Sequence, residues 1–379
     1  MPDRLTGFTM SESGEDFFEG KRPWSIIKDE VLKSYMSPYI AKVNKRGQRI
    51  LLIDGYAGPG MFGDGKPGSP VIICQAAEKF AKGNYQAIFI NIDQTYHNTL
   101  TQVIHQEGWS NSVKTRLGDS TVLLQQLAAS LTNQTVFLYI DPFGLKECEF
   151  ALLKPFLDRN RKFSTEIVLT MQMPIVHRLA TRHAVEDGRQ DEQIIKSYHQ
   201  RLTKVFGGEY WQDIMWQQNV SSEEREFQLI KAYQDKLTQY LAFVGSCPVR
   251  LQTDKRIKYF IVFASGHEDS MLLMNDIMVN AYFAKMHEAA YAGTLFEETD
   301  WREMRSTKGL DEAIIQTVAE YPGNTRHRIW LRIVQRHFMR YLEKEYRSAV
   351  MHLVDQKKLI TPTPRKTKLL NDNCRLYLP

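Results

Sequence analysis

The stretch LLIDGYAGPGMFGDGKPGSP, residues 51–70, decides how the rest of the chain is interpreted. An apolar run ends at Asp54, breaks into glycines and prolines, and turns apolar again at VIIC, residues 71–74. A helix that begins behind a parallel strand is where an open α/β sheet binds its ligand, because unpaired N–H groups point outward there. Glycine is needed where a ligand must press against the backbone. The stretch therefore predicts a buried strand followed by a ligand-binding turn, although a purely structural turn would also explain it.

Four apolar runs with the character of strands each end in aspartate. They are RILLID (49–54), AIFINID (87–93), VKTRLGD (113–119) and TVFLYID (135–141). Stretches long enough for helices separate them, which predicts right-handed βαβ units and a parallel sheet. A fifth strand is expected at TEIVLTMQ (165–172), and an antiparallel hairpin at CPVRLQ (247–252) and KYFIVFAS (258–265). Together these runs predict an α/β fold with a seven-stranded, mostly parallel sheet.

The chain of 379 residues is longer than a typical single domain, so we expect a main domain and a smaller second domain. Residues 1–22 lack apolar periodicity and are expected to form a flexible leader. The main domain is expected at 23–290, with a helical insertion at about 177–242. A linker at 291–308 would then join a smaller domain at 309–379.

Composition narrows the class of protein. The formal net charge of +5 is only mildly basic and does not by itself identify a nucleic-acid binder. The four cysteines are scattered without a CxxC pair, which argues against a disulfide framework and a zinc site and favours reduced thiols. We find no segment with the apolar length of a membrane span and no secretory signal, so a cytoplasmic location with no membrane partner is expected.

The aspartates at the strand ends indicate a nucleoside-binding cleft. Asp93 follows the second strand, where a carboxylate can accept hydrogen bonds from both ribose hydroxyls. Asp119 and Ser120 follow the third strand and are expected near the adenine. A phosphate loop is disfavoured, because Pro67 follows Lys66 where a magnesium-binding Ser or Thr should stand.

The segments IDGYAGPG, GSP, YIDPFG and KYFIVFASGHEDSMLLMNDIM, with WSIIKDEVLKSYMSPY upstream, resemble the three-Cys-motif partner (TcmP) family of bacterial and phage proteins. The resemblance covers roughly residues 20–290. It implies a Rossmann-like class I methyltransferase domain, often with a C-terminal winged-helix domain, and a partner protein with three cysteines related to radical S-adenosylmethionine enzymes. The cofactor it implies is S-adenosylmethionine. The residues expected to contact that cofactor are Asp54, Gly55, Tyr56, Gly58, Gly60, Asp93, Asp119 and Ser120.

The segment after the fourth strand is expected to be catalytic. Asp141, Pro142, Phe143 and Gly144 resemble the Asp-Pro-Pro-Tyr motif of amino-methyltransferases, whose acid and following carbonyl orient the target amine while the aromatic ring stacks on the base. The sequence departs from that motif, since Phe143 and Gly144 stand where the second proline and the aromatic residue are expected. The departure puts methylation of a base nitrogen in question and leaves the cofactor argument untouched.

The segment from Leu310 onward has three helical patterns followed by two short strands around a basic turn, the order of a winged helix-turn-helix. Its third helix is expected from about Glu343 to Gln356. Positive charge gathers at the end of this helix and in the wing, and such a patch can contact phosphates. The expected contacts are Arg347, Lys357, Lys358, Arg365, Lys366 and Lys368. Winged helices also serve as protein-interaction modules, so a protein partner stays open.

These features favour an S-adenosylmethionine-dependent methyltransferase that acts on nucleic acid or a nucleotide-like substrate. Transfer would depend on alignment of acceptor and methyl group, without a metal. The alternative is a non-enzymatic module that binds a cofactor and DNA and docks a radical S-adenosylmethionine-type protein. A third hypothesis is phosphoryl chemistry at the glycine-rich turn. It is weaker, because the turn lacks the Ser or Thr hydroxyl that would bind magnesium.

Overall fold

The computed structural model describes residues 23–142, 144–145, 148–159, 162–182, 191–250, 255–294, 297–362 and 371–379. The leader expected at 1–22 lies outside the described residues. The chain divides into two compact units, one of Met1–Thr170 with Glu192–Gly207 and the other of Met171–Asp191 with Gly208–Pro379. The domain bounds expected from the sequence stay a prediction.

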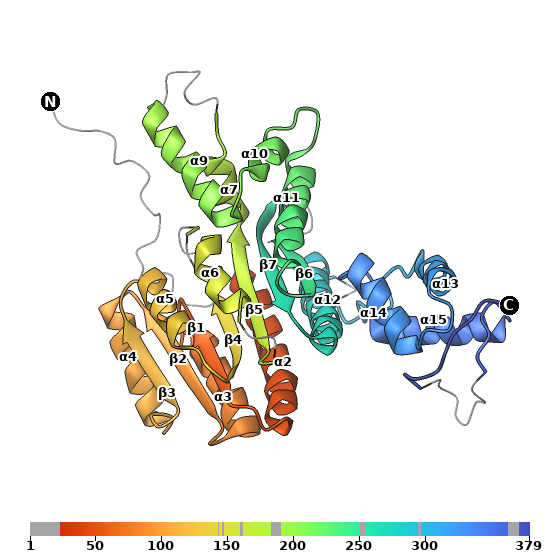
Figure 1. Cartoon of the computed structure of the whole chain (residues 1–379), viewed down its shortest axis with the longest axis horizontal. Helices are drawn as coiled ribbons and strands as arrows, with labels where there is room; N and C mark the ends of the chain where they lie inside the picture. Colours follow the sequence, from red (N-terminus) through yellow and green to blue (C-terminus); the bar gives the residue numbers. More distant parts are fainter. Residues whose placement is uncertain are drawn as a thin grey trace. The chain divides into compact units, whose positions relative to one another are not determined.

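The first unit is built on parallel strands (Figure 1). Its strands are β1 (Ile50–Asp54), β2 (Tyr85–Asn91), β3 (Val113–Leu117), β4 (Thr135–Ile140) and β5 (Thr165–Gln172). Every neighbouring pair runs parallel, with β1 between β2 and β4. All residues of β1 and β4 are buried, as expected for central strands of a sheet covered on both faces.

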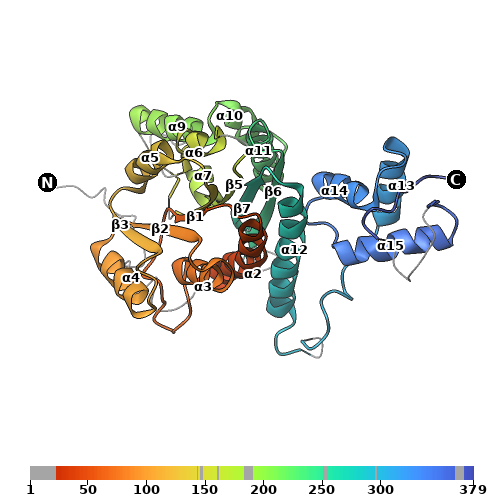
Figure 2. The ribbon, with the colours of Figure 1, turned by 60° about the horizontal axis from the view of Figure 1, so that its bottom comes forward.

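Helices cover both faces of this sheet. They are α2 (Pro23–Lys45), α3 (Ser69–Ala81), α4 (Gln94–Gln106), α5 (Ser120–Ser130), α6 (Phe150–Leu157) and α9 (Glu192–Phe206). Figure 2 shows α2, α3 and α4 on one face and α5, α6 and α9 on the other. The strands and connecting helices expected from the four runs that end in aspartate are confirmed.

The second unit contains the hairpin β6 (Phe243–Arg250) and β7 (Ile257–Ser265), which pair antiparallel as expected. The helices of this part are α7 (Met173–Leu179), α10 (Tyr210–Met215), α11 (Ser222–Leu237) and α12 (Glu268–Tyr291). With the hairpin, the sheet has seven strands in the order β3-β2-β1-β4-β5-β7-β6. The expected Rossmann-like α/β fold, a seven-stranded and mostly parallel sheet with helices, is therefore confirmed.

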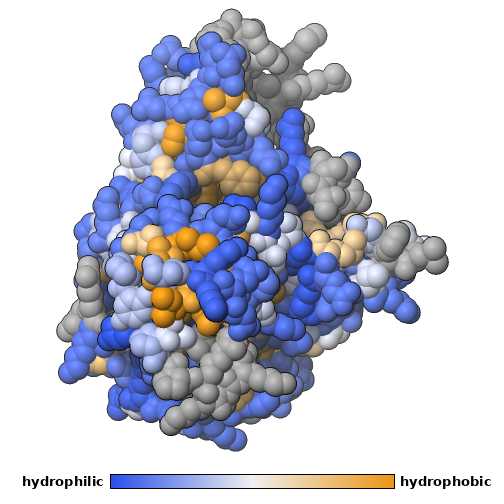
Figure 3. Space-filling view, turned by 90° about the vertical axis from the view of Figure 1, so that its right-hand side faces the viewer, coloured by the Kyte–Doolittle hydropathy of each residue, from blue (hydrophilic) through white to orange (hydrophobic). Residues whose placement is uncertain are grey.

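Hydrophilic side chains predominate on the face shown in Figure 3, around a compact apolar patch. Among the described helices, none combines the length and the apolar composition that a membrane span requires. The four cysteines are all buried and free, as expected of reduced thiols.

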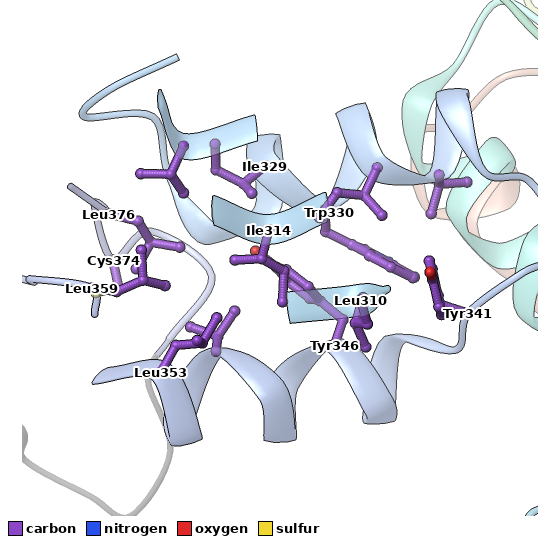
Figure 4. Packing of buried hydrophobic residues seen from close by; sticks show 14 of the residues in the cluster. Leu310, Ile314, Ile329, Trp330, Tyr341, Tyr346, Leu353, Leu359, Cys374 and Leu376 are labelled. Atoms are coloured by element: carbon purple, nitrogen blue, oxygen red, sulfur yellow. The ribbon is translucent and has the colours of Figure 1, made fainter. Parts of the chain in front are cut away.

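Three helices with a shared core end the chain: α13 (Leu310–Glu320), α14 (Arg326–Arg336) and α15 (Glu343–Asp355). Trp330 of α14 and Tyr346 of α15 stack between the helices, with ring centroids 4.9 Å apart (Figure 4). Isolated bridges join Ile360 to Tyr377 and Thr325 to Arg375. The third helix matches the range expected from the sequence to within one residue at its end.

Candidate functional site

The carboxyl ends of β1 and β4 form the switch point of the parallel sheet. From β1 the chain continues to β2 and β3 on one side, and it returns to β4 and β5 on the other. At such a point the connections leave in opposite directions, and α/β sheets bind their ligands in the crevice between them. Asp54 pairs in register with Tyr139, so Asp141 lies two residues beyond the level of Asp54 on the neighbouring strand.

Asp54 is fully buried and ties the glycine-rich turn together. Its Oδ1 accepts a hydrogen bond from the backbone N–H of Tyr56 at 3.0 Å, and its Oδ2 accepts one from Ser69 Oγ at 2.6 Å. Burial raises the pKa of Asp54 to about 7, against the opposing effect of these hydrogen bonds. The carboxyl group thus joins the end of β1 to the start of α3.

The turn packs closely around two glycines. Gly55 donates its N–H to the carbonyl of Tyr139 at 3.0 Å, and a Cβ there would lie 3.0 Å from Ile140 Cδ1. Gly60 has a φ of +90°, and its Cβ would lie 2.9 Å from Leu100 Cδ1. The backbone of the turn is therefore held against the sheet and against α4.

Beyond Gly60 the chain forms a short hairpin. Met61 and Pro67 are bridged, and the N–H of Phe62 donates to the carbonyl of Lys66 at 2.9 Å. Lys66 pairs with Asp64 at 2.7 Å. This lysine is engaged within its own turn.

Asp93 and Asp119 lie after β2 and β3 and cap the helices that follow. Asp93 accepts hydrogen bonds from the N–H groups of Thr95 at 2.8 Å and Tyr96 at 2.9 Å. Asp119 accepts one from the N–H of Thr121 at 2.8 Å. Both carboxylates also have capping roles, which alone would explain aspartate at these positions.

Ser120 and Ile92 are the residues next to these two helix caps, and they differ in burial. Ser120 is buried and donates from Oγ to the carbonyl of Gly55 at 2.6 Å, so the start of α5 is joined to the end of β1. Ile92, which precedes Asp93, is an apolar side chain with 76% exposure. An apolar side chain so exposed, next to the strand-end carboxylates, suits a face against which a flat ring can pack.

Asn91 at the end of β2 was not foreseen in the sequence. Its Nδ2 donates to the carbonyls of Ala57 and of Gly58, the latter at 3.2 Å, and so holds the turn from the other side. Its Oδ1 is buried and has no hydrogen-bond partner among the described residues. A buried acceptor without a partner is costly, and a ligand donor would remove that cost. The polar residue within FINID, otherwise an apolar run, was the available signal.

Asp141 is joined to two residues from other elements. Its Oδ2 forms an ion pair with Lys28 of α2, and its Oδ1 accepts a hydrogen bond from Thr170 Oγ1 of β5 at 2.7 Å. Burial lowers the pKa of Lys28, but the charges of Asp141 and Asp29 and the bond to Asp141 raise it by more. The Lys28 side chain is only 15% exposed, because it points to the sheet rather than to water.

The remaining predicted residues are placed as follows. Pro142 is buried, Gly144 is half-buried, and Phe143 lies outside the described residues. Arg347 pairs with Glu343 and lies 3.7 Å from Asp372. Lys357 and Lys358 are exposed after α15, whereas Arg365, Lys366 and Lys368 lie outside the described residues.

Comparison with other proteins gives a limited likeness to solved structures. No protein-family model matches the sequence. No curated protein matches it either. An O-methyltransferase from Bacillus cereus in complex with SAH is 13% identical, with 65% of this chain and 82% of that chain covered and a TM-score of 0.34. A Legionella pneumophila protein is 10% identical, with 68% and 92% covered and a TM-score of 0.39. A methyltransferase from Geobacter sulfurreducens is 14% identical, with a TM-score of 0.24, and the match spans 35% of this chain and 58% of that protein's length.

Proposed function

We propose that this protein is an S-adenosylmethionine-dependent methyltransferase. The observation that supports this most is the set of polar strand ends at the switch point: buried Asp54 in a glycine turn, Asn91 with an unpartnered acceptor, and Asp141 after the neighbouring strand β4. Open α/β sheets bind nucleoside cofactors at this place.

The residues present suit such a cofactor. The Asp93 carboxylate would bind ribose hydroxyls, Asn91 Oδ1 would accept a donor of the ligand, and Ile92 would pack against the adenine. The glycine turn would lie along the methionine part, with Tyr56, Gly58, Gly60, Asp119 and Ser120 around the ligand. The cofactor supplies an electrophilic methyl group, and the chain's own task is to align the acceptor with it.

The segment of Asp141, Pro142, Phe143 and Gly144 would bind the substrate group that accepts the methyl. We propose nucleic acid or a nucleotide-like molecule as the substrate, with α13, α14 and α15 as a winged-helix domain that holds it. The shared core of the three helices and the bridge between Ile360 and Tyr377 support that assignment. A three-Cys-motif partner protein, as in the TcmP family, is part of the same proposal.

Calorimetry with S-adenosylmethionine and S-adenosylhomocysteine tests the cofactor. We expect both to bind, and Asp93→Asn to weaken binding about tenfold or more, because asparagine keeps the helix cap but removes the carboxylate. Asp158→Asn is the control for removing a carboxylate elsewhere in the same unit, since Asp158 is exposed at the end of α6 and pairs with Lys154. Binding of ATP with magnesium, and of neither methionine derivative, would overturn the proposal.

A second candidate, a binding module without transfer, is favoured by the ion pair between Lys28 and Asp141. Both oxygens of Asp141 already have partners, so the carboxylate is less available to an acceptor. Transfer of labelled methyl to DNA, RNA or nucleosides separates the two candidates. Label transfer that disappears in Asp141→Asn while cofactor binding persists would exclude the pure binder.

A further inference from the structure

The excess positive charge of the chain lies in its C-terminal segment, and within that segment α14 holds four arginines and no acidic residue. Residues 309–379 hold thirteen Arg and Lys against seven Asp and Glu, a formal charge of +6, whereas the whole chain carries +5. The rest of the chain is thus close to neutral. Such asymmetry is typical of a segment that meets a polyanion.

A row of four arginines lies along α14 and just beyond its end. We call Arg328, Arg332, Arg336 and Arg340 the arginine stripe. All four are exposed, and the first three stand at i, i+4 and i+8 of one helix. Residues so spaced share a face and lie about 6 Å apart along the axis. The opposite face of α14, which includes Ile329 and Trp330, is buried in the core.

The charge of the stripe is only partly neutralised. Arg328 pairs with Glu268 and Arg336 with Glu320, and these two arginine side chains are 56% and 38% exposed. Arg332 lies over the ring of Tyr321 at 5.0 Å, and Arg340 donates to the carbonyl of Lys308 at 3.4 Å. Within the described part of the chain, neither of these two pairs with a carboxylate. The stripe therefore keeps a net positive charge.

His337, which follows Arg336, has its pKa lowered by burial and then by the charges of Arg340 and Arg336 in the stripe. A groove of about 480 Å3 borders the stripe, with Gln335 and Arg336 on one side and Lys231 of α11 on another. Arg336 and Gln335 thus bring donors to the edge of a largely apolar groove, and Lys231 there also pairs with Asp235.

The helix that sequence reasoning favoured is less suited to phosphate. The first turn of α15 carries Glu343 and Glu345, and its Arg347 pairs with Glu343. Asp372 also lies 3.7 Å from Arg347. Negative charge at this end of α15 would repel a phosphate backbone.

We propose that the arginine stripe of α14 contacts the phosphate backbone of a double-stranded nucleic acid. One guanidinium group can donate two parallel hydrogen bonds to the oxygens of a phosphate. Exposed ion pairs such as those with Glu268 and Glu320 are weak enough for phosphate to replace the carboxylate. This inference rests on the nucleic-acid partner named in the proposed function, but not on cofactor binding or methyl transfer.

Fluorescence anisotropy with a labelled, mixed-sequence DNA duplex tests it on the full chain, from about 50 to 200 mM salt. Each phosphate contact contributes about 0.9 to the slope of log K against log salt, so Arg332→Gln/Arg336→Gln should reduce the slope by about 2. The control is Arg201→Gln/Lys204→Gln on α9, which changes the net charge equally and should leave the slope unchanged. Thermal unfolding of each variant verifies that it is folded.

Four results would overturn the inference. The first is no duplex binding by the folded wild-type chain at the lowest salt. The second is a slope that changes in Lys357→Gln/Lys358→Gln but not in the stripe variant, which would place the contacts at the end of α15. The third is an equal loss in the control, which would show an effect of net charge alone. The fourth is poly-glutamate binding as tight as duplex binding, which would indicate an acidic protein surface as the partner. Calorimetry with the cofactor separates any of these from failure of the proposed methyl transfer.

Discussion

At the residue scale, Asp54 shows how one buried carboxyl group can hold a turn. It is fully buried, and its two hydrogen bonds hold the turn that follows β1. Burial raises its pKa to about 7, so the group is partly protonated near neutral pH. A carboxyl group in this state can adapt to a ligand that brings its own charge.

The raised pKa of Asp54 predicts how stability depends on pH. Between the ordinary value of 3.8 and about 7, the folded state keeps a proton that the unfolded state releases, so stability falls as pH rises through that window and levels off above it. Asp54→Asn removes this dependence. In urea unfolding, the stability of Asp54→Asn relative to wild type should increase by roughly 3 kcal/mol from pH 4 to pH 7. Parallel pH profiles for the two proteins would contradict the assignment.

Residues of the site differ in how visible they are in the sequence. Asp54, Asp93, Asp119 and Asp141 could be predicted because each follows an apolar run, and strand ends of a parallel sheet meet at one edge. Lys28 could not, because its contact with Asp141 spans 113 positions and depends on how α2 packs on the sheet. The roles of the predicted residues in binding and catalysis stay predictions.

At the level of elements, the glycine-rich turn depends on left-handed backbone conformations that glycine adopts easily, as well as on hydrogen bonds. Gly60 and Gly65 both have a positive φ, but only at Gly60 would a Cβ meet a close neighbour, the Cδ1 of buried Leu100. The two positions therefore separate the cost of the conformation from the cost of a clash.

Alanine at these two glycines should give different losses of stability. Gly65→Ala should cost about 1 kcal/mol, the cost of a left-handed conformation for an L residue. Gly60→Ala should cost about 1–3 kcal/mol more, because its Cβ would lie 2.9 Å from Leu100 Cδ1. Urea unfolding of the two variants measures the difference. Equal losses would mean that α4 moves aside without cost.

At the scale of the molecule, Asn275 joins α12 to the segment that leads into α15 within the second unit. It is fully buried, donates to the carbonyl of Tyr341 at 2.9 Å, and accepts from the N–H of Met339 at 2.8 Å. One side chain thus satisfies two backbone groups that would otherwise lack partners.

Asn275→Ala should destabilise the C-terminal helices by about 2–4 kcal/mol, because both backbone groups lose their partner. Hydrogen exchange should become faster at residues 339–343. Asn280→Ala on the same helix is the control and should change stability by less than about 1 kcal/mol. Exchange at 339–343 that is equally fast in both variants would exclude this role for Asn275.

The alternation of strands and helices, the hairpin that ends the sheet and the C-terminal helices could all be predicted from the amino-acid sequence. Local apolar periodicity and turn chemistry encode these features, so neighbouring residues are enough to predict them. The contacts of Lys28 and Thr170 with Asp141, the support of the turn by Asn91, and the exposure of Arg328, Arg332 and Arg336 on one face of α14 are visible only in the folded chain. These contacts depend on packing between distant segments, and no local pattern records which partner a charged side chain finds once the core has formed.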